Sequence, residues 1–360
     1  IVYVTRLTKK KWAGPNTSVP KQIEAQSKLD NVFWYDVANL VKGQKAGNIM
    51  CHCIDEYPSF KIDKLPAPFN RPDLVVFEGL YFWQFLKVAK SCRDNRIPYI
   101  IIPRCSLTNQ AQRSKRIKKM VGNFLFFNRF VKKAAAIQYL TQKEYLDSGD
   151  KWNKKCIIVP NGIDEKSRVK ELYNTDIIKG IFIGRLDIYH KGLDLLIKAC
   201  SKMKEELENN NCKIYVHGPG IRGSKLKLEK LIKAHHLEAV LCIKEAVFDK
   251  EKEEKLLESD FFIQTSRFEG HPMGLIEALS YGLPCLVTSG TNMADEIKKA
   301  NAGWVADVSV EGIIGALESL LKERNFAQKG MNALNLSKKY NWDNLANISH
   351  KKYVDLLKDN

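Results

Sequence analysis

SRFEGHPMGLIEALSYGLPCLVTSG occupies Ser266–Gly290 and directly follows the apolar run Phe261–Gln264. That run has the pattern of a buried strand, and a helix is predicted to begin near Met273, so a short loop joins a strand to a helix. The first turn of a helix has N–H groups without intrahelical partners and carries the positive end of the helix dipole. Gly270 and Gly274 would let a ligand approach this backbone closely. The stretch therefore predicts a phosphate-binding turn at the carboxyl end of a strand.

Two glutamates, Glu269 and Glu277, stand eight positions apart in this stretch. A carboxylate does not favour a phosphate, so both acids must serve another part of the ligand. Carboxylates accept paired hydrogen bonds from vicinal hydroxyls, as at a ribose. The pattern predicts a nucleotide sugar, with Glu269 at the sugar end and Glu277 at the ribose end. The alternative is a surface loop followed by a solvated acid on a helix.

Short apolar runs alternate with helical patterns along the whole chain, which indicates parallel sheets covered on both faces. The strands predicted in the first half are Ile1–Val4, Val32–Tyr35, Leu74–Phe77, Tyr99–Ile102, Ala136–Tyr139 and Cys156–Val159, with helices at Val19–Leu29, Tyr81–Arg93 and Arg113–Phe130. The strands predicted in the second half are Gly180–Ile183, Lys213–His217, Phe261–Gln264 and Cys285–Val287, with helices at Leu193–Glu208, Leu226–Ala234, Lys250–Leu257 and Leu275–Tyr281. The fold class is therefore α/β with two Rossmann-like domains, and ligands are expected at the carboxyl ends of the strands, in the cleft between the domains.

A Pro–Gly turn signal near 160–164 marks the domain boundary. We expect residues 1–161 to form one domain and residues 162–341 the other. The last helix, about 342–360, follows the complete second sheet and is expected to pack back on the first domain.

Charge is distributed unevenly along the 360 residues, whose formal net charge is +17. Residues 1–164 hold 28 Lys and Arg against 13 Asp and Glu, whereas residues 165–360 hold 30 against 28. A basic half attracts nucleic acid, anionic lipid or a phosphorylated substrate. No apolar run reaches the ~18 residues of a membrane-spanning helix. The nine cysteines are scattered and odd in number, which favours reduced thiols in the cytoplasm.

Two cations follow the predicted strand Gly180–Ile183. Gly184 ends this strand, and Arg185 and Lys191 lie in the next loop. Cations at the carboxyl edge of a sheet can neutralise a diphosphate and stabilise a departing nucleoside diphosphate in place of a metal ion. No Asp-x-Asp occurs in the chain, so we expect no metal and no cofactor besides the nucleotide sugar. The alternative for either cation is a solvated loop charge.

These motifs resemble the signature of family 4 glycosyltransferases, which have two facing Rossmann-like domains, the GT-B arrangement. Glu269-Gly270 and the segment from Glu277 to Pro284 match the two-glutamate motif, and 183–186 with Lys191-Gly192 resemble the Gly-Arg-Leu…Lys-Gly motif. The resemblance implies a retaining hexosyltransferase, with same-face attack and a leaving phosphate that takes the acceptor's proton. Its implied catalytic residues are Glu269, Arg185, Lys191 and Arg104. Its implied donor-binding residues are Gly14, Gly184, Arg185, Lys191, Gly218, Val247, Glu269, Gly270, His271, Pro272, Met273, Gly274, Leu275 and Glu277.

Two positions of the basic half depart from the family pattern. Gly14 fits the glycine loop after the first strand, although the usual paired glycines are absent. Relatives have Pro-His-Gly where this chain has Pro103-Arg104-Cys105. Arg104 is predicted to bind a sugar hydroxyl, a donor phosphate or an acceptor phosphate, and a structural salt bridge is the alternative.

A strongly basic segment precedes an aromatic one in the first half. Its cations, Arg113, Lys115, Arg116, Lys118 and Lys119, are followed by the aromatic segment 124–130. A helix with cations and aromatic residues settles on anionic lipid, which predicts a membrane and acceptor surface here. The alternative places Phe124, Phe127 and Phe130 in the core and leaves the cations in solvent.

The function predicted is metal-independent transfer of a sugar from a UDP- or GDP-linked donor to a polyprenyl-diphosphate-linked glycan. Such an enzyme of bacterial surface-polysaccharide synthesis, capsule included, would be peripheral on the inner face of the cell membrane. The sequence does not distinguish uracil from guanine. The alternatives are a sugar-nucleotide epimerase of the same architecture and a basic nucleic-acid-binding protein, although no nucleic-acid-binding motif occurs.

Overall fold

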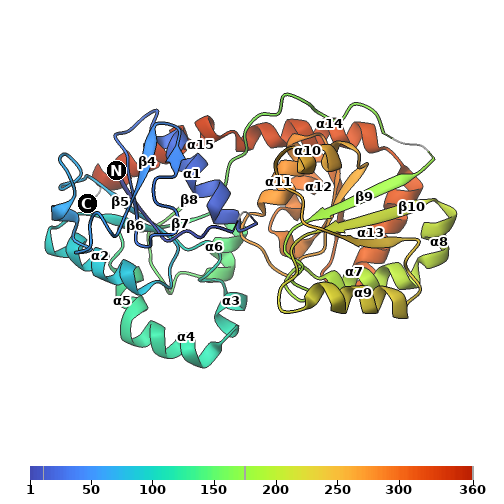
Figure 1. Ribbon diagram of the computed structural model, residues 1–360, viewed down its shortest axis with the longest axis horizontal. Helices are drawn as coiled ribbons and strands as arrows, with labels where there is room; N and C mark the ends of the chain where they lie inside the picture. The colour runs from blue at the N-terminus through green and yellow to red at the C-terminus, as the bar shows by residue number, and fades with distance from the viewer. Residues whose placement is uncertain (11, 174–175, 359–360) are drawn as a thin grey trace. The chain divides into compact units, whose positions relative to one another are not determined.

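The computed structural model describes residues 1–10, 12–173 and 176–358. It divides the chain into unit 1, made of Ile1–Gly162 and Trp342–Asn360, and unit 2, made of Ile163–Asn341 (Figure 1). The division falls one residue after the predicted boundary. The last helix, α15 (Trp342–Lys358), is grouped with unit 1 although it directly follows unit 2 in the sequence.

Unit 1 is built on a sheet with the strand order β3-β4-β2-β1-β5-β6-β7-β8. Neighbouring strands are parallel except for the antiparallel pair β3 and β4. The strands are β1 (Val2–Thr5), β2 (Phe33–Asp36), β3 (Lys45–Ala46), β4 (Ile49–Cys53), β5 (Val75–Glu78), β6 (Tyr99–Ile102), β7 (Ala136–Tyr139) and β8 (Cys156–Ile158). Every strand predicted in this half is present, and the short pair β3–β4 was not predicted.

Helices cover both faces of this sheet because alternate strand residues point to opposite sides. Val2, Val4 and Phe77 pack in one apolar cluster with residues of α2 and α5. Tyr3 and Val76 pack in another cluster with residues of α1 and α15. The helices of unit 1 are α1 (Gly14–Gln26), η1 (Ile62–Lys64), α2 (Trp83–Asp94), α3 (Asn109–Arg113), α4 (Arg116–Gly122), η2 (Asn123–Phe127), α5 (Asn128–Lys132), α6 (Gln142–Ser148) and α15.

The single helix predicted over Arg113–Phe130 is confirmed from Arg116 onward, where α4, the π-helical turn η2 and α5 form one continuous helical run to Lys132. Its predicted start is wrong, because Arg113 is the last residue of the separate helix α3. Lys115 has φ 54°, in the left-handed region, and this residue separates α3 from α4. A non-glycine residue in that region costs ~1–2 kcal/mol, which a periodicity argument does not anticipate.

Unit 2 is built on an entirely parallel sheet with the strand order β11-β10-β9-β12-β13-β14. Its strands are β9 (Ile178–Ile183), β10 (Cys212–His217), β11 (Leu241–Lys244), β12 (Phe261–Gln264), β13 (Cys285–Thr288) and β14 (Gly303–Ala306). Its helices are α7 (Leu193–Lys202), α8 (Lys204–Asn209), α9 (Ser224–Ala234), α10 (Asp249–Leu257), α11 (Met273–Ser280), η3 (Ser289–Thr291), α12 (Ala294–Ala300), α13 (Val310–Glu323), α14 (Phe326–Ser337) and η4 (Lys338–Tyr340). The predicted helix Leu193–Glu208 is interrupted at Met203, so it forms two helices.

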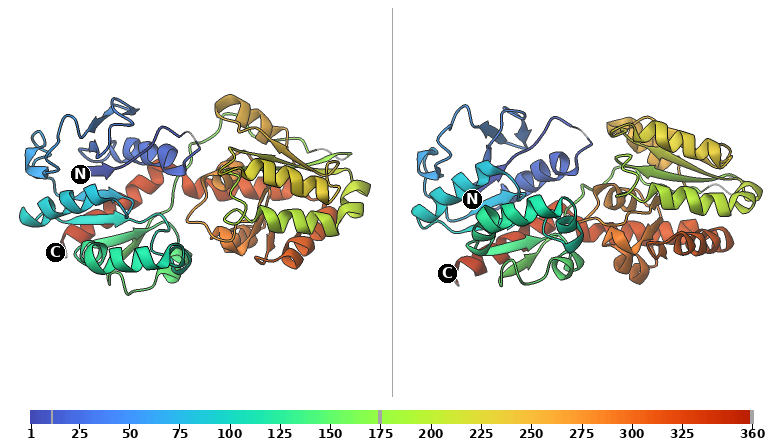
Figure 2. Two further views of the ribbon diagram at one scale, coloured as in Figure 1. Left: turned by 60° about the horizontal axis from the view of Figure 1, so that its bottom comes forward. Right: turned by 90° about the horizontal axis from the view of Figure 1, so that it is seen from below.

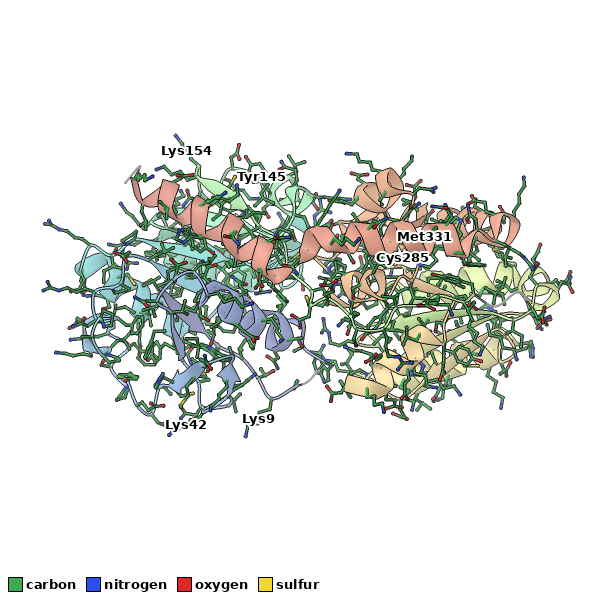
Figure 3. The ribbon with its side chains drawn as sticks, turned by 90° about the horizontal axis from the view of Figure 1, so that it is seen from above. Lys9, Lys42, Tyr145, Lys154, Cys285 and Met331 are labelled. Atoms are coloured by element: carbon green, nitrogen blue, oxygen red, sulfur yellow. The ribbon has the colours of Figure 1, made fainter. Side chains whose placement is uncertain are left out.

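The two faces of the unit 2 sheet are filled by separate apolar clusters. Phe182 and Phe261 face the cluster of α7, α9 and α13, whereas Ile181 and Phe262 face that of α11, α12 and α14. Helices on both sides of the sheet can be followed in Figure 2. Cys285, labelled in Figure 3, is fully buried in the second cluster. All nine cysteines are free thiols in the structure.

Candidate active site

Two loops of unit 2 meet at the carboxyl edge of the sheet because β9 and β12 are neighbouring strands. Gly192, at the start of α7, has φ +64°, and a Cβ there would lie 2.0 Å from the carbonyl oxygen of Thr265. Only glycine allows this close approach. The Thr265 hydroxyl donates to the carbonyl oxygens of Lys191 and Gly192, each over 3.1 Å. The loop that carries Lys191 is therefore tied to the loop that carries Glu269.

A half-buried ion pair strengthens the connection between these loops. Arg267 binds Asp194 through two parallel hydrogen bonds of 2.7 Å and also donates to the carbonyl oxygen of Tyr189. Asp194 lies in the first turn of α7, where a carboxylate is favoured. Paired Arg–carboxylate contacts fix geometry as well as supplying energy. Arg267 therefore holds the two loops in one relative position.

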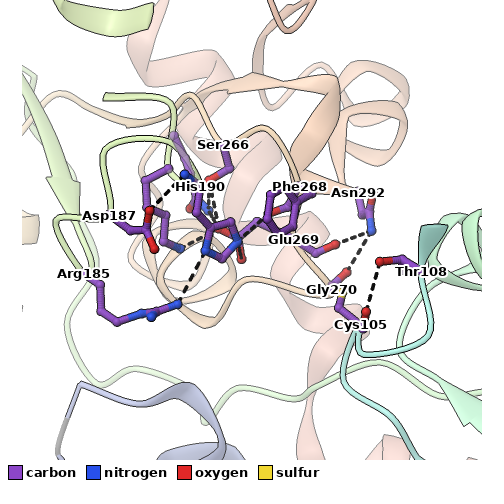
Figure 4. Close-up of polar contacts among 12 residues, drawn as sticks. Cys105, Thr108, Arg185, Asp187, His190, Ser266, Phe268, Glu269, Gly270 and Asn292 are labelled. Carbon is purple, nitrogen blue, oxygen red and sulfur yellow. Dashed lines mark hydrogen bonds and ion pairs between the residues drawn. The ribbon is translucent and has the colours of Figure 1, made fainter. Parts of the chain in front are cut away.

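Glu269 lies at the centre of the polar contacts in Figure 4. Its Oε1 accepts hydrogen bonds from Lys191 Nζ over 2.5 Å, from Ser266 Oγ over 2.8 Å and from Gln264 Nε2 over 3.1 Å. The side chains of Lys191 and Glu269 are 14% and 11% exposed. The structure therefore brings together two of the predicted site residues as a largely buried ion pair.

The charge of Glu269 is set by its surroundings. Burial raises the pKa of its carboxyl, but the charge of Lys191 and the hydrogen bonds from Lys191 and Ser266 outweigh burial, so the pKa lies below its ordinary value. The carboxylate is thus ionised at neutral pH and accepts hydrogen bonds without donating any. The predicted role of Glu269 in orienting sugar hydroxyls stays a prediction.

His190 connects Arg185 to this ion pair and was not predicted. Its Nε2 lies 2.7 Å from the carbonyl oxygen of Phe268, and its ring stacks on that of Phe268. A carbonyl oxygen only accepts, so Nε2 carries the proton and Nδ1 of the neutral ring is an acceptor. Nδ1 lies 3.5 Å from Arg185 Nη2, and Nε2 lies 3.9 Å from Glu269 Oε2. Burial lowers the pKa of His190, which favours this neutral form.

The second predicted acid, Glu277, lies on α11 and also has a cationic partner. Lys252 of α10 contacts Glu277 over 2.7 Å, with side chains 27% and 16% exposed. Glu277 therefore forms an ion pair within unit 2, and its predicted place at the ribose stays a prediction. Lys252 was not predicted because its helix has only the pattern of a charged, solvated helix.

The predicted phosphate-binding turn opens α11. Pro272 precedes the first helical residue, Met273, and a Cβ on Gly274 would lie 3.1 Å from the carbonyl oxygen of Ile183. His271 is buried, and burial lowers its pKa to about 3, so this ring is neutral. Leu275 is fully buried in an apolar cluster, so its predicted contact with the donor stays a prediction.

The remaining donor-site residues of unit 2 also lie at this edge of the sheet. Gly184 and Gly218 follow the neighbouring strands β9 and β10, and a Cβ on Gly218 would lie 1.7 Å from the carbonyl oxygen of Gly184. His217 Nδ1 lies 3.0 Å from the carbonyl oxygen of Glu245, in the loop that holds Val247. Val247 is buried. Its predicted contact with the donor stays a prediction.

Arg104 of unit 1 is held in a polar cluster. It pairs with Glu78 over 2.9 Å and donates to Ser18 Oγ and Asn161 Oδ1. The side chain of Glu78 is fully buried and that of Arg104 is 12% exposed. These contacts match the salt-bridge alternative, and a role for Arg104 in catalysis stays a prediction.

Gly14 is the first residue of α1. This helix begins five residues before the predicted start because Pro15 suits a first turn.

The segment predicted to contact a membrane exposes apolar as well as basic side chains. We call Ile117, Met120, Val121, Phe124, Leu125 and Phe126 the α4–η2 face; their exposed fractions range from 40% to 81%. Phe127 and Phe130 are buried, as the core alternative predicts, whereas Phe124 is not, and contact with a membrane stays a prediction. Arg113, Lys115, Arg116 and Lys118 are exposed. Lys119 is half-buried and donates to the carbonyl oxygen of Ala111.

Among the described residues 1–10, 12–173 and 176–358, no three His, Cys, Asp or Glu residues gather as metal ligands would. In the same described part of the chain, no helix combines the length and apolarity that crossing a membrane requires.

Comparison with known proteins gives a family match for most of unit 2. Residues 163–333 match the model of the family described as Glycosyl transferases group 1. Protein CapJ of Staphylococcus aureus is 29% identical over 174 residues, which cover 47% of this chain and 42% of CapJ. One component of the phosphatidylinositol N-acetylglucosaminyltransferase of Homo sapiens is 24% identical over 200 residues, covering 54% of this chain and 40% of that protein. The chain thus spans less than half the length of these relatives.

The comparison with solved structures concerns the fold. The structure of Anabaena Alr3699/HepE in complex with UDP superposes with a TM-score of 0.73 at 13% identity, covering 98% of this chain and 99% of that chain. The predicted fold class is therefore confirmed: the chain has two Rossmann-like α/β units of the GT-B type. The comparisons support neither the epimerase nor the nucleic-acid-binding alternative.

Proposed function

We propose that this protein is a retaining glycosyltransferase that moves a sugar from a nucleotide-sugar donor to a lipid-linked glycan without a metal ion. The observation that carries the proposal is the cluster of Arg185, His190, Lys191 and Glu269 at the carboxyl edge of the unit 2 sheet, in a glycosyltransferase group 1 domain. The cluster holds both signs of charge that such a donor needs. The cations would balance the charge of its diphosphate, and the carboxylate would accept hydrogen bonds from its sugar hydroxyls.

The residues act through charge and position. Arg185 and Lys191 would balance the charge that builds up on the diphosphate as the sugar departs, which is where preorganised charge lowers a barrier. Glu269, held by Ser266 and Gln264, would fix the sugar's orientation. The retaining course, with the leaving phosphate accepting the proton of the incoming hydroxyl, follows from the family resemblance. Glu269 is not required to act as a base.

The acceptor is proposed from the α4–η2 face. Ile117, Met120, Val121 and Phe124 recur at the spacing of one helical stripe, and exposed cations flank them. This combination suits the surface of an anionic membrane. The human relative is named for phosphatidylinositol, a lipid. A polyprenyl-diphosphate-linked glycan, elongated at the inner face of a bacterial cell membrane, fits these features, and the similarity to CapJ supports a capsule or related surface polysaccharide.

The test is hydrolysis of a panel of UDP-, GDP- and ADP-sugars by the purified protein in the presence of a chelator. We expect one nucleotide class to be hydrolysed with the anomeric configuration retained, and Lys191→Gln to abolish the reaction. Lys198→Gln is the matched control because Lys198 is exposed on α7, shortly after the site loop. Activity only with added divalent metal would contradict metal independence. An inverted product would contradict the retaining course, and inertness toward the whole panel under both conditions would contradict the proposal.

A further inference from the structure

An open hollow of about 550 Å³ lies in unit 1, at the ends of two neighbouring strands. Arg6 follows β1, and Phe82 and Trp83 follow β5 at the start of α2. Pockets that bind small ligands have volumes in this range and lie at the carboxyl ends of parallel strands. The hollow shares no residue with the predicted donor site.

The charge of the hollow favours an anion. Arg6 and Lys87 are its two charged lining residues, and both are cations. Neither forms an ion pair with any other residue in the described part of the chain. Arg6 lies over the ring of Phe82 at 5.1 Å, and Lys87 lies over the ring of Phe60 at 4.9 Å. Each cation therefore rests on an aromatic ring and stays available to a phosphate.

The hollow continues onto an exposed apolar surface. Trp83, which lines it, is 57% exposed, and its ring contacts that of Phe126 at 4.5 Å. Phe126 belongs to the α4–η2 face, which this contact joins to the hollow. A ligand with an anionic head in the hollow would thus have an apolar path for a long tail. Lys119 lies over the ring of Tyr81, another lining residue, and adds a third cation at this end.

We propose that this hollow binds the phosphate-bearing head of an isoprenoid lipid, with Arg6 and Lys87 on the phosphates and the tail over Trp83 and the α4–η2 face. The inference rests on the proposed function, because the lipid would be the carrier of the acceptor glycan. It goes further by assigning a site for the phosphates, separate from the cations of the donor site. The exposure of Trp83 is explained by this assignment, since a large aromatic side chain otherwise gains by burial.

The experiment measures binding and location without any transfer reaction. A photoreactive analogue of farnesyl diphosphate is titrated into the full chain, and the labelled peptide is found by mass spectrometry. We expect labelling within 81–87 and a loss of affinity of at least ~10-fold in the double variant Arg6→Gln/Lys87→Gln. Lys90→Gln, one turn further along α2 and paired with Asp94 on the exposed side, should bind like the wild type.

Three outcomes would overturn the inference. They are unchanged affinity in the double variant, equal binding of the uncharged alcohol farnesol, and equal competition by a soluble anionic oligosaccharide. Inorganic pyrophosphate, which lacks a tail, should compete at least ~10-fold less well than farnesyl diphosphate at this site. The proposed function fails separately: lipid binding without hydrolysis of any nucleotide sugar would leave this site standing and contradict the transferase. Donor hydrolysis without lipid binding would contradict this lipid site and leave the proposed transferase function standing.

Discussion

The carboxylate of Glu269 is held by more donors than a solvated loop acid would have, and this allows a direct test of its role. Replacing Glu269 by Gln keeps the shape and removes the charge that pairs with Lys191. We expect kcat/KM for the donor to fall about 100-fold, the order for a hydrogen bond to a charged group. Glu258→Gln, which removes an exposed carboxylate of a surface pair, should leave the rate unchanged.

The same substitution has a pH-dependent effect on stability. The pKa of Glu269 in the folded chain lies below its ordinary value of 4.5, so the ionised group stabilises the fold above that pH. This contribution is lost as the pH falls through the lowered pKa. The difference in unfolding free energy between wild type and Glu269→Gln should therefore shrink on acidification. A difference that grows toward low pH would contradict an ionised Glu269.

His190 offers a test that separates its two ring nitrogens. Asn places an acceptor near the position of Nδ1, whereas Gln places a donor near that of Nε2. If His190 positions Arg185 at the diphosphate, His190→Gln should raise the donor KM about 10-fold, and His190→Asn should raise it less.

The wild type should show a pH dependence for the same reason. The donor KM should change as the pH falls below 6.5 toward the lowered pKa of His190, because a protonated Nδ1 no longer accepts a hydrogen bond from Arg185. Equal KM values in both variants across pH 5–8 would contradict this role.

The Ser266–Gly290 stretch and the loop after β9 were sufficient to predict several residues of the candidate site, and what they missed has a physical reason. Arg185, Lys191, Glu269 and their glycines stand in spaced motifs whose chemistry can be inferred from residue type. Lys252 carries no such signal, because only the packing of α10 beside α11 brings it to Glu277. Cys105 shows a further case: its φ of 67° explains why relatives have glycine at this position, and no periodicity indicates it.

At the scale of elements, strands were predicted more accurately than helices. A buried parallel strand is an uninterrupted apolar run, whereas a helix is interrupted by single backbone angles such as that of Lys115. The helical run that follows this break exposes an apolar stripe on α4 and η2. Periodicity alone did not indicate which of its aromatic residues are exposed.

The α4–η2 face leads to a prediction about membrane binding. Phe124, the most exposed of its residues at 81%, is replaced together with Ile117 by Ser. Losing these two side chains should weaken binding to vesicles containing anionic phospholipid at least ~10-fold, since burying each one contributes ~1.5–3 kcal/mol. Co-sedimentation with vesicles measures the effect. Leu226→Ser removes an exposed apolar residue of α9 in unit 2 and is the control. Wild-type binding by the Phe124/Ile117 variant would contradict a membrane surface here.

At the scale of the whole molecule, the chain forms unit 1, then unit 2, and then returns to unit 1. The basic charge in residues 1–164 therefore belongs to the unit that carries the α4–η2 face, and the nearly neutral remainder belongs mostly to the unit with the donor-site residues. Sequence order alone would assign α15 to unit 2, because α14 and η4 directly precede it. Packing decides otherwise: residues of α15 are buried in the same cluster as Tyr3 and Trp34 of the unit 1 sheet.

This return leads to a prediction about which unit depends on the last helix. Tyr353 is buried, and its hydroxyl donates to Gln138 Oε1 of β7 over 2.7 Å. Tyr353→Ala should lower the unfolding free energy of unit 1 by about 3–5 kcal/mol, the cost of deleting a large buried aromatic side chain. Hydrogen exchange resolved by peptide should show lost protection in the strands of unit 1 and none in β9–β14. Lys351→Ala, on the exposed side of α15, is the control. We expect the two units to unfold separately when only unit 1 loses its helical cover. Loss of protection in β9–β14 would therefore contradict the prediction, because it would mean that α15 stabilises unit 2 directly.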